Sequence, residues 1–252
     1  MTLSGFFDIF TGRQVVSIIG CGGKTTLLWA LAQMNRGKKV LLTTTTHMQR
    51  PDSASGLFDF FFCNDTANFT VKNGITLAGN IDAKGKFGSL QPETLETLLK
   101  GFDISVIEAD GSRGLPLKGW EHYEPVITES TTLTIGILPL HTIGMTADEN
   151  SIHRLPLWTK LCRTEEGCKI THAHIADTIY STNGKSLFSA AKGDLVLFLN
   201  RAESETSLED AVKIVNLLPK DFLHTIKIIA AVSLLKNEFT ILWDGGKTLR
   251  NF

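Results

Sequence analysis

The sequence predicts an α/β fold in which helices cover both faces of a mostly parallel sheet. Two observations favour this fold: apolar strands alternate with helical patterns, and several strands are continuous apolar runs, such as residues 195–199. Strands of a parallel sheet have this character because both of their faces are buried. A length of 252 residues suits one large domain of this class. We therefore expect residues 1–252 to form a single domain.

The individual elements follow from the spacing of apolar residues. Apolar runs of strand length occur at residues 15–19, 39–43, 103–108, 132–138, 195–199, 226–232 and 239–243. Helical periodicity occurs at residues 25–35, 92–100, 151–162, 174–181 and 207–218. In the first of these helices Leu27, Leu28 and Leu31 share one face, and Gly37 ends the helix.

A different pattern covers residues 57–90, where apolar and polar side chains alternate between glycines and asparagines. Phe58, Phe60 and Phe62 share one face, and Asn73-Gly74 is typical of a hairpin turn. We expect a small β-rich insertion at residues 57–90. Its phenylalanines form either a buried sheet edge or a docking surface for a partner.

Charge and composition exclude some classes of partner. The chain has 25 basic and 26 acidic residues, so it has no basic field to attract nucleic acid or an anionic membrane. The longest apolar run, near residues 226–235, contains Lys227 and is too short to cross a bilayer. The first residues lack the basic segment of a signal peptide. We expect a cytoplasmic protein that binds neither nucleic acid nor membrane, of an oligomeric state that the sequence does not determine.

The strand at residues 15–19 runs into a glycine-rich loop and then a helix. The residues that we expect to bind nucleotide phosphates are Gly20, Cys21, Gly22, Gly23, Lys24, Thr25 and Thr26. Glycines let the backbone approach phosphate, and the helix start adds unpaired amides and the positive end of its dipole. Lys24 is expected on the β- and γ-phosphates of ATP or GTP, and the Thr25 hydroxyl on Mg²⁺.

This order of parts predicts a P-loop NTPase type of fold. The loop is shorter than usual, because Ile18 stands where the longer form has its first glycine. A packing turn with a solvated lysine would have a similar composition. The strand before the loop and the helix after it favour phosphate binding.

The strand at residues 103–108 leads into two acids, Glu108 and Asp110. Alternation places both on one side if the strand continues, and the carboxyl edge of a parallel sheet faces the phosphate loop. We expect Glu108 or Asp110 to hold Mg²⁺ or to orient an attacking nucleophile. Arg113 follows in the next loop; it stabilises a transferring phosphoryl group, clamps an anionic substrate, or is an ordinary surface arginine.

Two further strand ends carry polar residues. Four threonines at residues 43–46 precede His47, which we expect to position water or substrate, although threonines are also common at strand ends. The strand at residues 195–199 is followed by Asn200, Arg201 and, two residues later, Glu203. This N-R-x-E sequence resembles the N-K-x-D base-recognition motif of GTPases. The longer glutamate does not preserve the contact to guanine, so the base stays open, as does the alternative of a simple polar loop.

These segments together resemble the YqeC family. The resemblance is carried by G-C-G-G-K-T-T at residues 20–26, T-T-T-T-H-M at residues 43–48 and E-A-D-G-S-R-G-L-P-L-K at residues 108–118. Smaller matches are E-P-V-I at residues 124–127, H-R at residues 153–154 and N-R at residues 200–201. The resemblance implies an accessory protein of a selenium-dependent molybdenum hydroxylase. The short loop is also similar to that of the Mur ligases, whose strand-end glutamate near Mg²⁺ corresponds to Glu108.

The residues and the resemblance together predict a nucleotide-binding protein, a Mg²⁺-dependent NTPase that helps to mature a molybdenum hydroxylase or its cofactor. A first alternative is a kinase or ligase that acts on a small anionic substrate or cofactor, bound by Arg113, Lys118 and His47. A second alternative is a non-catalytic module that binds nucleotide and docks on the hydroxylase.

Overall fold

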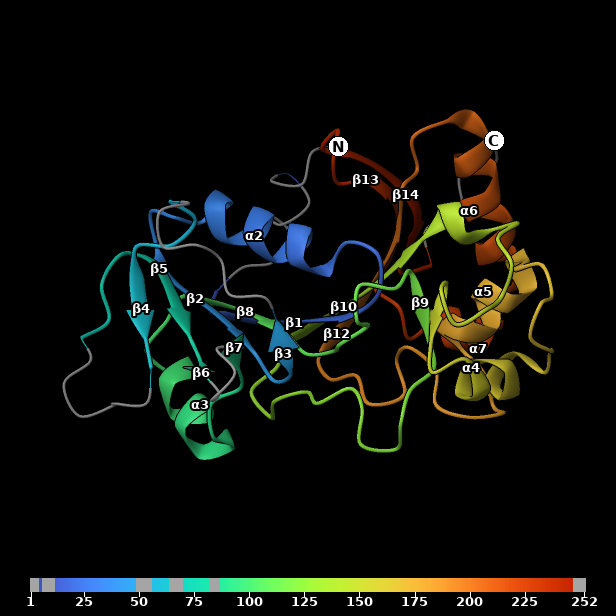
Figure 1. The fold of residues 1–252 in the computed structure, drawn as a ribbon. Helices are drawn as coiled ribbons and strands as arrows, with labels where there is room; N and C mark the ends of the chain where they lie inside the picture. Colours follow the sequence, from blue (N-terminus) through green and yellow to red (C-terminus); the bar gives the residue numbers. More distant parts are fainter. Residues whose placement is uncertain (1–4, 6–11, 49–55, 64–69, 82–86, 247–252) are drawn as a thin grey trace.

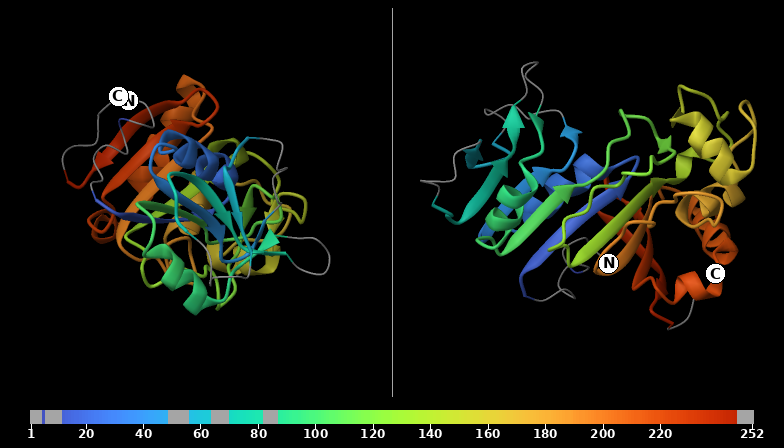
Figure 2. Two further views of the ribbon diagram at one scale, coloured as in Figure 1. Left: turned by 90° about the vertical axis from the view of Figure 1, so that its left-hand side faces the viewer. Right: turned by 90° about the horizontal axis from the view of Figure 1, so that it is seen from below.

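The computed structural model describes residues 5, 12–48, 56–63, 70–81 and 87–246. Its main sheet contains β1 (Gln14–Gly20), β2 (Lys39–Thr44), β4 (Phe60–Phe62), β5 (Gly74–Ala78), β8 (Ile104–Glu108), β10 (Leu133–Pro139), β12 (Asp194–Asn200), β13 (Ile228–Ser233) and β14 (Glu238–Asp244). The strand order is β4-β5-β2-β8-β1-β10-β12-β13-β14 (Figure 1). Every neighbouring pair is parallel except β13 and β14. The sheet twists strongly from one edge to the other (Figure 2).

Helices cover both faces of this sheet. The helix α2 (Lys24–Met34) lies on one face (Figure 1). The opposite face is covered by α3 (Pro92–Leu99), α4 (Leu155–Cys162), α5 (His172–Ile179), α6 (Glu205–Leu217) and α7 (Lys220–Leu223). The alternation along β1 explains the two layers, because Val16 and Ile18 pack toward α2 whereas Val15 and Ile19 belong to the other core. The predicted fold class, α/β with a mostly parallel sheet, is confirmed.

Most predicted elements are found within a few residues of their expected bounds, and two differences have local causes. The helix expected from residue 151 begins only at Leu155, because Arg154 has a left-handed backbone, with φ of 57°. Before it, β11 (Ile152–His153) pairs with β9 (Leu117–Lys118). The helix expected from residue 174 begins at His172, because the Thr171 hydroxyl accepts the His174 N–H and caps it.

The segment at residues 57–90 is β-rich, but its strands divide between two sheets. The strands β4 and β5 extend the main sheet, while β6 (Asn80–Ile81) and β7 (Phe87–Gly88) form a small sheet with β3 (His47–Met48). The hairpin predicted at Asn73-Gly74 is wrong, because β4 and β5 are parallel and Gly74 pairs with Lys39 of β2. The Phe61 ring lies 6.2 Å from that of Phe87, so this edge is partly buried.

The strand order brings the carboxyl ends of several central strands together. The strand β1 lies between β8 and β10, and all three run in the same direction. Their carboxyl ends, and that of β12, therefore meet at the edge where α2 begins. Among the described residues, no helix has both the length and the apolar character required to span a membrane.

Candidate functional site

Three residues connect the end of β1 to the start of α2, and two of them must be glycine. Gly22 and Gly23 have φ angles of 69° and 143°, which side chains rarely allow. A Cβ atom at Gly22 would lie 2.4 Å from Pro139 of β10, and one at Gly23 would lie 2.6 Å from the Asn200 amide. The loop is therefore pressed against the ends of β10 and β12.

The loop leaves a row of backbone donors open. The amides of residues 22–26 donate to no acceptor within the described part of the chain, and Gly23 caps α2 without a side-chain hydrogen bond. By contrast, Gly20 N donates to Asp110 Oδ2 at 3.1 Å, and Cys21 N donates to Ile137 O at 2.8 Å. The amides expected at positions 20 and 21 are thus already used by the protein. The row of open amides begins at Gly22.

Cys21 is also closed to ligands through its side chain. The thiol is fully buried, and burial raises its pKa to about 12. A buried thiol with a raised pKa holds its proton at neutral pH and is a poor nucleophile. In this structure neither the amide nor the thiol of Cys21 is open to the nucleotide expected there, and the side chain packs in the core.

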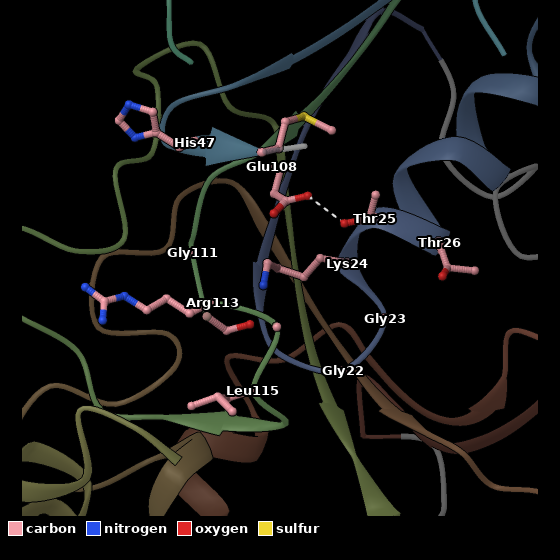
Figure 3. Close-up of a pocket in the computed structure, with 13 residues that line it drawn as sticks. Gly22, Gly23, Lys24, Thr25, Thr26, His47, Glu108, Gly111, Arg113 and Leu115 are labelled. Atoms are coloured by element: carbon pink, nitrogen blue, oxygen red, sulfur yellow. Dashed lines mark hydrogen bonds between the residues drawn. The ribbon is translucent and has the colours of Figure 1, made fainter. Parts of the chain in front are cut away.

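Lys24, Thr25 and Glu108 come together at the open side of the loop (Figure 3). Lys24 is only 6% exposed, and its Nζ donates to Gly20 O at 2.7 Å. Thr25 Oγ1 donates to Glu108 Oε2 at 3.1 Å. Burial raises the pKa of Glu108, although Lys24 and the Thr25 hydroxyl counteract that rise. A hydroxyl, a carboxylate and an ammonium thus face one space.

Asp110 does not join this group, although only one residue separates it from Glu108. It is fully buried and accepts hydrogen bonds from Lys118 through Oδ1, and from Gly20 N and Trp120 Nε1 through Oδ2. The strand β8 ends at Glu108, so the alternation that would place both acids together stops there. In this structure neither oxygen of Asp110 is open to the metal expected there, and fully buried Lys118 is likewise closed to an acceptor substrate.

Two cavities meet at the loop. A cavity of about 440 Å³ is lined on one side by Lys24, Thr25 and Glu108. Residues 111–115 form its opposite wall. A second cavity, of about 320 Å³, lies on the other side and reaches Asn200. Both are lined by Gly22, Gly23, Thr26 and Gly114. The amide row therefore borders two connected spaces, hereafter the larger and the smaller cavity.

His47 and Arg113 lie at the outer part of the larger cavity. Both side chains are exposed, and Figure 3 shows them pointing away from Lys24. Arg113 has a φ of 52°, a left-handed conformation that costs a non-glycine residue about 1 kcal/mol. Neither residue contacts the Thr25–Glu108 pair in this structure, so any action on a bound ligand would occur at its far end.

Asn200 braces the loop. Its Nδ2 donates to Gly22 O at 2.7 Å, and its Oδ1 accepts the Leu234 N–H at 3.3 Å. Arg201 lines the smaller cavity and lies 3.5 Å from Glu203. Asn200 and Arg201 line this cavity, whereas Glu203 does not.

The sequence did not indicate three residues of the smaller cavity, namely His141, Leu234 and Leu235. The pKa of His141 is lowered by burial and by the nearby charge of Arg201. The two leucines follow β13, whose carboxyl end lies at the same edge of the sheet. The place of the two leucines directly after an apolar strand is the feature of the sequence that could have indicated them.

The fold and the site define a class: an open, mostly parallel α/β protein with a glycine loop and free helix amides at the carboxyl edge of its sheet. The chain belongs to the YqeC family, because the family model described as YqeC protein matches residues 16–156, more than half of its length. This range contains the loop, Glu108 and Asp110, and excludes Asn200.

Similarity to a curated relative agrees with this assignment. The chain is 36% identical over 149 residues to the Uncharacterized protein YqeC of Escherichia coli (strain K12). The match covers 56% of this chain and 57% of the relative. No solved structure matches the chain significantly.

Proposed function

We propose that the chain binds a nucleoside triphosphate with Mg²⁺ at the larger cavity and hydrolyses it as an NTPase. The observation that supports this most is the row of free amides at residues 22–26 beside the Thr25–Glu108 pair. Free amides at a helix start bind phosphate, and a hydroxyl with a carboxylate suits Mg²⁺. As the resemblance to the YqeC family implies, the activity would serve the maturation of a selenium-dependent molybdenum hydroxylase.

The donor set fits both groups. Five backbone N–H groups and the Lys24 ammonium supply hydrogen bonds and positive charge for phosphate oxygens. Mg²⁺ prefers oxygen ligands and uses one or two protein groups besides phosphates and water. Thr25 Oγ1 and Glu108 offer two such oxygens 3.1 Å apart. A cation there would counter the effect of burial on the Glu108 pKa and favour its ionised form.

The same geometry supports a proposal for the orientation of the nucleotide. The terminal phosphates would lie beside Thr25 and Glu108, because these two residues would hold the Mg²⁺ that neutralises phosphate charge. The base and ribose then extend across Thr26 toward the smaller cavity, where Leu234 and Leu235 offer apolar contact. Lys24 must leave Gly20 O to reach a phosphate. With Glu203 outside this cavity, adenine and guanine remain equal candidates.

Binding of fluorescent ATP and GTP analogues tests the proposal. Lys24→Ala is expected to weaken binding at least tenfold, because it removes a charge-assisted contact to phosphate. Lys38→Ala is the matched control, since Lys38 is an exposed lysine outside both cavities. If Lys24→Ala binds nucleotide as tightly as the wild type, the phosphate role of the loop is excluded.

Transfer to an acceptor is the second candidate, favoured by His47 and Arg113 at the outer part of the larger cavity. Product analysis separates the candidates. Free phosphate without any acceptor supports the NTPase, whereas diphosphate formed only with an added small acid supports transfer. Binding without turnover, even with the hydroxylase present, supports the non-catalytic docking module. Hydroxylase activity in cells that carry Lys24→Ala measures the maturation role.

A further inference from the structure

We propose that Asp110 is a positioning residue whose buried carboxylate fixes the entrance of the phosphate-binding loop, held in place by Lys118. The inference rests on the proposed function. It assigns Asp110 a role distinct from that of Glu108, which lies at the cavity. The two acids are separated by Ala109 alone, so their roles are distinguished by their contacts and not by their place in the chain.

The contacts of Asp110 all lead to backbone or to buried partners. Oδ2 accepts from Gly20 N at 3.1 Å and from Trp120 Nε1 at 2.8 Å. Oδ1 accepts from Lys118, whose Nζ also donates to Gly111 O at 2.6 Å. Both oxygens are thus engaged, and the side chain has no exposed surface. A metal ion at the larger cavity would find neither oxygen free.

Lys118 belongs to a chain of alternating charges. Its Nζ lies 3.0 Å from Glu124 Oε2, and the Arg154 guanidinium donates to both Glu124 oxygens. The two cations and the two acids, Asp110 and Glu124, balance one another. Buried charges are stable only when they are paired and hydrogen-bonded in this way. The network therefore holds the Asp110 side chain in place under the loop.

The carboxylate acts where the loop leaves β1. With Gly20 N held by Asp110, the next peptide is oriented so that Cys21 N meets Ile137 O and Gly20 O faces Lys24. After Asp110, the chain forms the opposite wall of the larger cavity at residues 111–115. One carboxylate thus connects both walls, and a fixed loop binds with a smaller entropy cost than a mobile loop.

A magnesium titration distinguishes positioning from metal binding. Nucleotide affinity is measured for the wild type, Asp110→Asn and Glu108→Gln, in EDTA and over a series of Mg²⁺ concentrations. We expect Asp110→Asn to weaken binding about tenfold at every concentration, EDTA included, with an unchanged Mg²⁺ midpoint. Glu108→Gln should raise the midpoint and leave the affinity in EDTA unchanged.

Each other outcome has a defined meaning. If Asp110→Asn raises the Mg²⁺ midpoint as Glu108→Gln does, Asp110 is a metal ligand and the inference fails. If Asp110→Asn binds as the wild type at every concentration, the inference fails while the proposed function stands. If the wild type binds no nucleotide, the proposed function itself fails.

A pair of double variants controls for folding, because Asp110→Asn leaves Lys118 without its counter-charge. Asp110→Asn with Lys118→Met is uncharged yet retains an amide oxygen for Gly20 N and Trp120. Asp110→Ala with Lys118→Met lacks that acceptor. We expect near wild-type affinity in the first and about tenfold weaker binding in the second. Equal affinity in the two would overturn the positioning role.

Discussion

Only one residue separates Glu108 from Asp110, yet their surroundings have little in common. Glu108 faces the larger cavity, has one side-chain hydrogen bond, to Thr25, and has a raised pKa because of burial. Asp110 lies beneath the loop, where three donors and a balanced charge network engage both of its oxygens. The environment, and not the residue type, decides which carboxylate remains available for a ligand.

The two sides should therefore respond differently when a lysine is removed. Lys118→Met leaves Asp110 and Glu124 buried with fewer partners, and we expect a loss of about 3–5 kcal/mol in the free energy of unfolding. Lys24→Met removes a hydrogen bond to one backbone oxygen and should cost about 1 kcal/mol. Urea denaturation measures both. Equal losses would contradict the contrast between the network and the cavity.

Glu124 provides a pH test of the buried side. Burial pushes its pKa upward, but hydrogen bonds and charge from Arg154 and Lys118 outweigh burial and lower it below the usual 4.5. The unfolded chain then binds more protons than the folded chain in the window below 4.5. Stability from Glu124 is present above that window and is lost as the pH falls through the lowered value.

The expected outcome concerns the difference between the wild type and Glu124→Gln. At pH 7 the variant should be less stable by about 2 kcal/mol, and the difference should shrink as the pH falls below 4.5. Lys118 and Arg154 form ion pairs with Glu124, and Arg154 also lies 3.9 Å from Glu121. His153 interacts electrostatically with Glu124 as well. Denaturation midpoints at pH 7 and at a pH below 4.5 measure the effect. A difference that is constant with pH would rule out this account.

Glu108 should behave in the opposite sense. Its raised pKa means that the folded chain holds this proton at a higher pH than the unfolded chain, so stability falls as the pH rises above 4.5. Glu108→Gln carries no charge to desolvate, and we expect it to stabilise the nucleotide-free protein by roughly 0.5–1 kcal/mol at pH 7. Thermal unfolding measures the gain. A destabilised variant would indicate that Glu108 serves the fold and not a ligand.

The surroundings of Glu108 at the larger cavity could be predicted from the sequence. A strand, a glycine loop and a helix are local features, and parallel strands bring their carboxyl ends to one edge. The approach of Thr25 to Glu108 follows from these two facts. The free amides follow too, because a helix that begins directly after glycines has no side chain to cap it.

The buried side could not be predicted, because it depends on contacts distant from the local pattern. The place where β8 ends decides that Asp110 turns beneath the loop, and Trp120 and Lys118 reach it from a different segment. The parallel pairing of β4 with β5 was missed for the same reason. The Asn73-Gly74 signal describes only a local turn, whereas the partner of Gly74 is Lys39.

The smallest expected effect concerns Arg113 at the larger cavity. Like Arg154 of the charge network, Arg113 has a left-handed backbone conformation. Their φ angles are 52° and 57°. Arg154 is held by Glu124, whereas Arg113 has no hydrogen-bond or ion-pair partner among the described residues. Arg113→Gly should therefore relieve strain and stabilise the protein by about 0.5 kcal/mol.

A matched control separates this gain from a role at the cavity. Arg163 has a φ of 49°, follows α4 and lines neither cavity. Arg163→Gly therefore relieves similar strain away from the site, although it also removes an exposed hydrogen bond to Asn183. Thermal unfolding measures stability, and product formation measures turnover. If Arg113 acts on the ligand, turnover should fall in Arg113→Gly alone. Equal turnover in the two variants would show that the charge of Arg113 does not contribute to turnover.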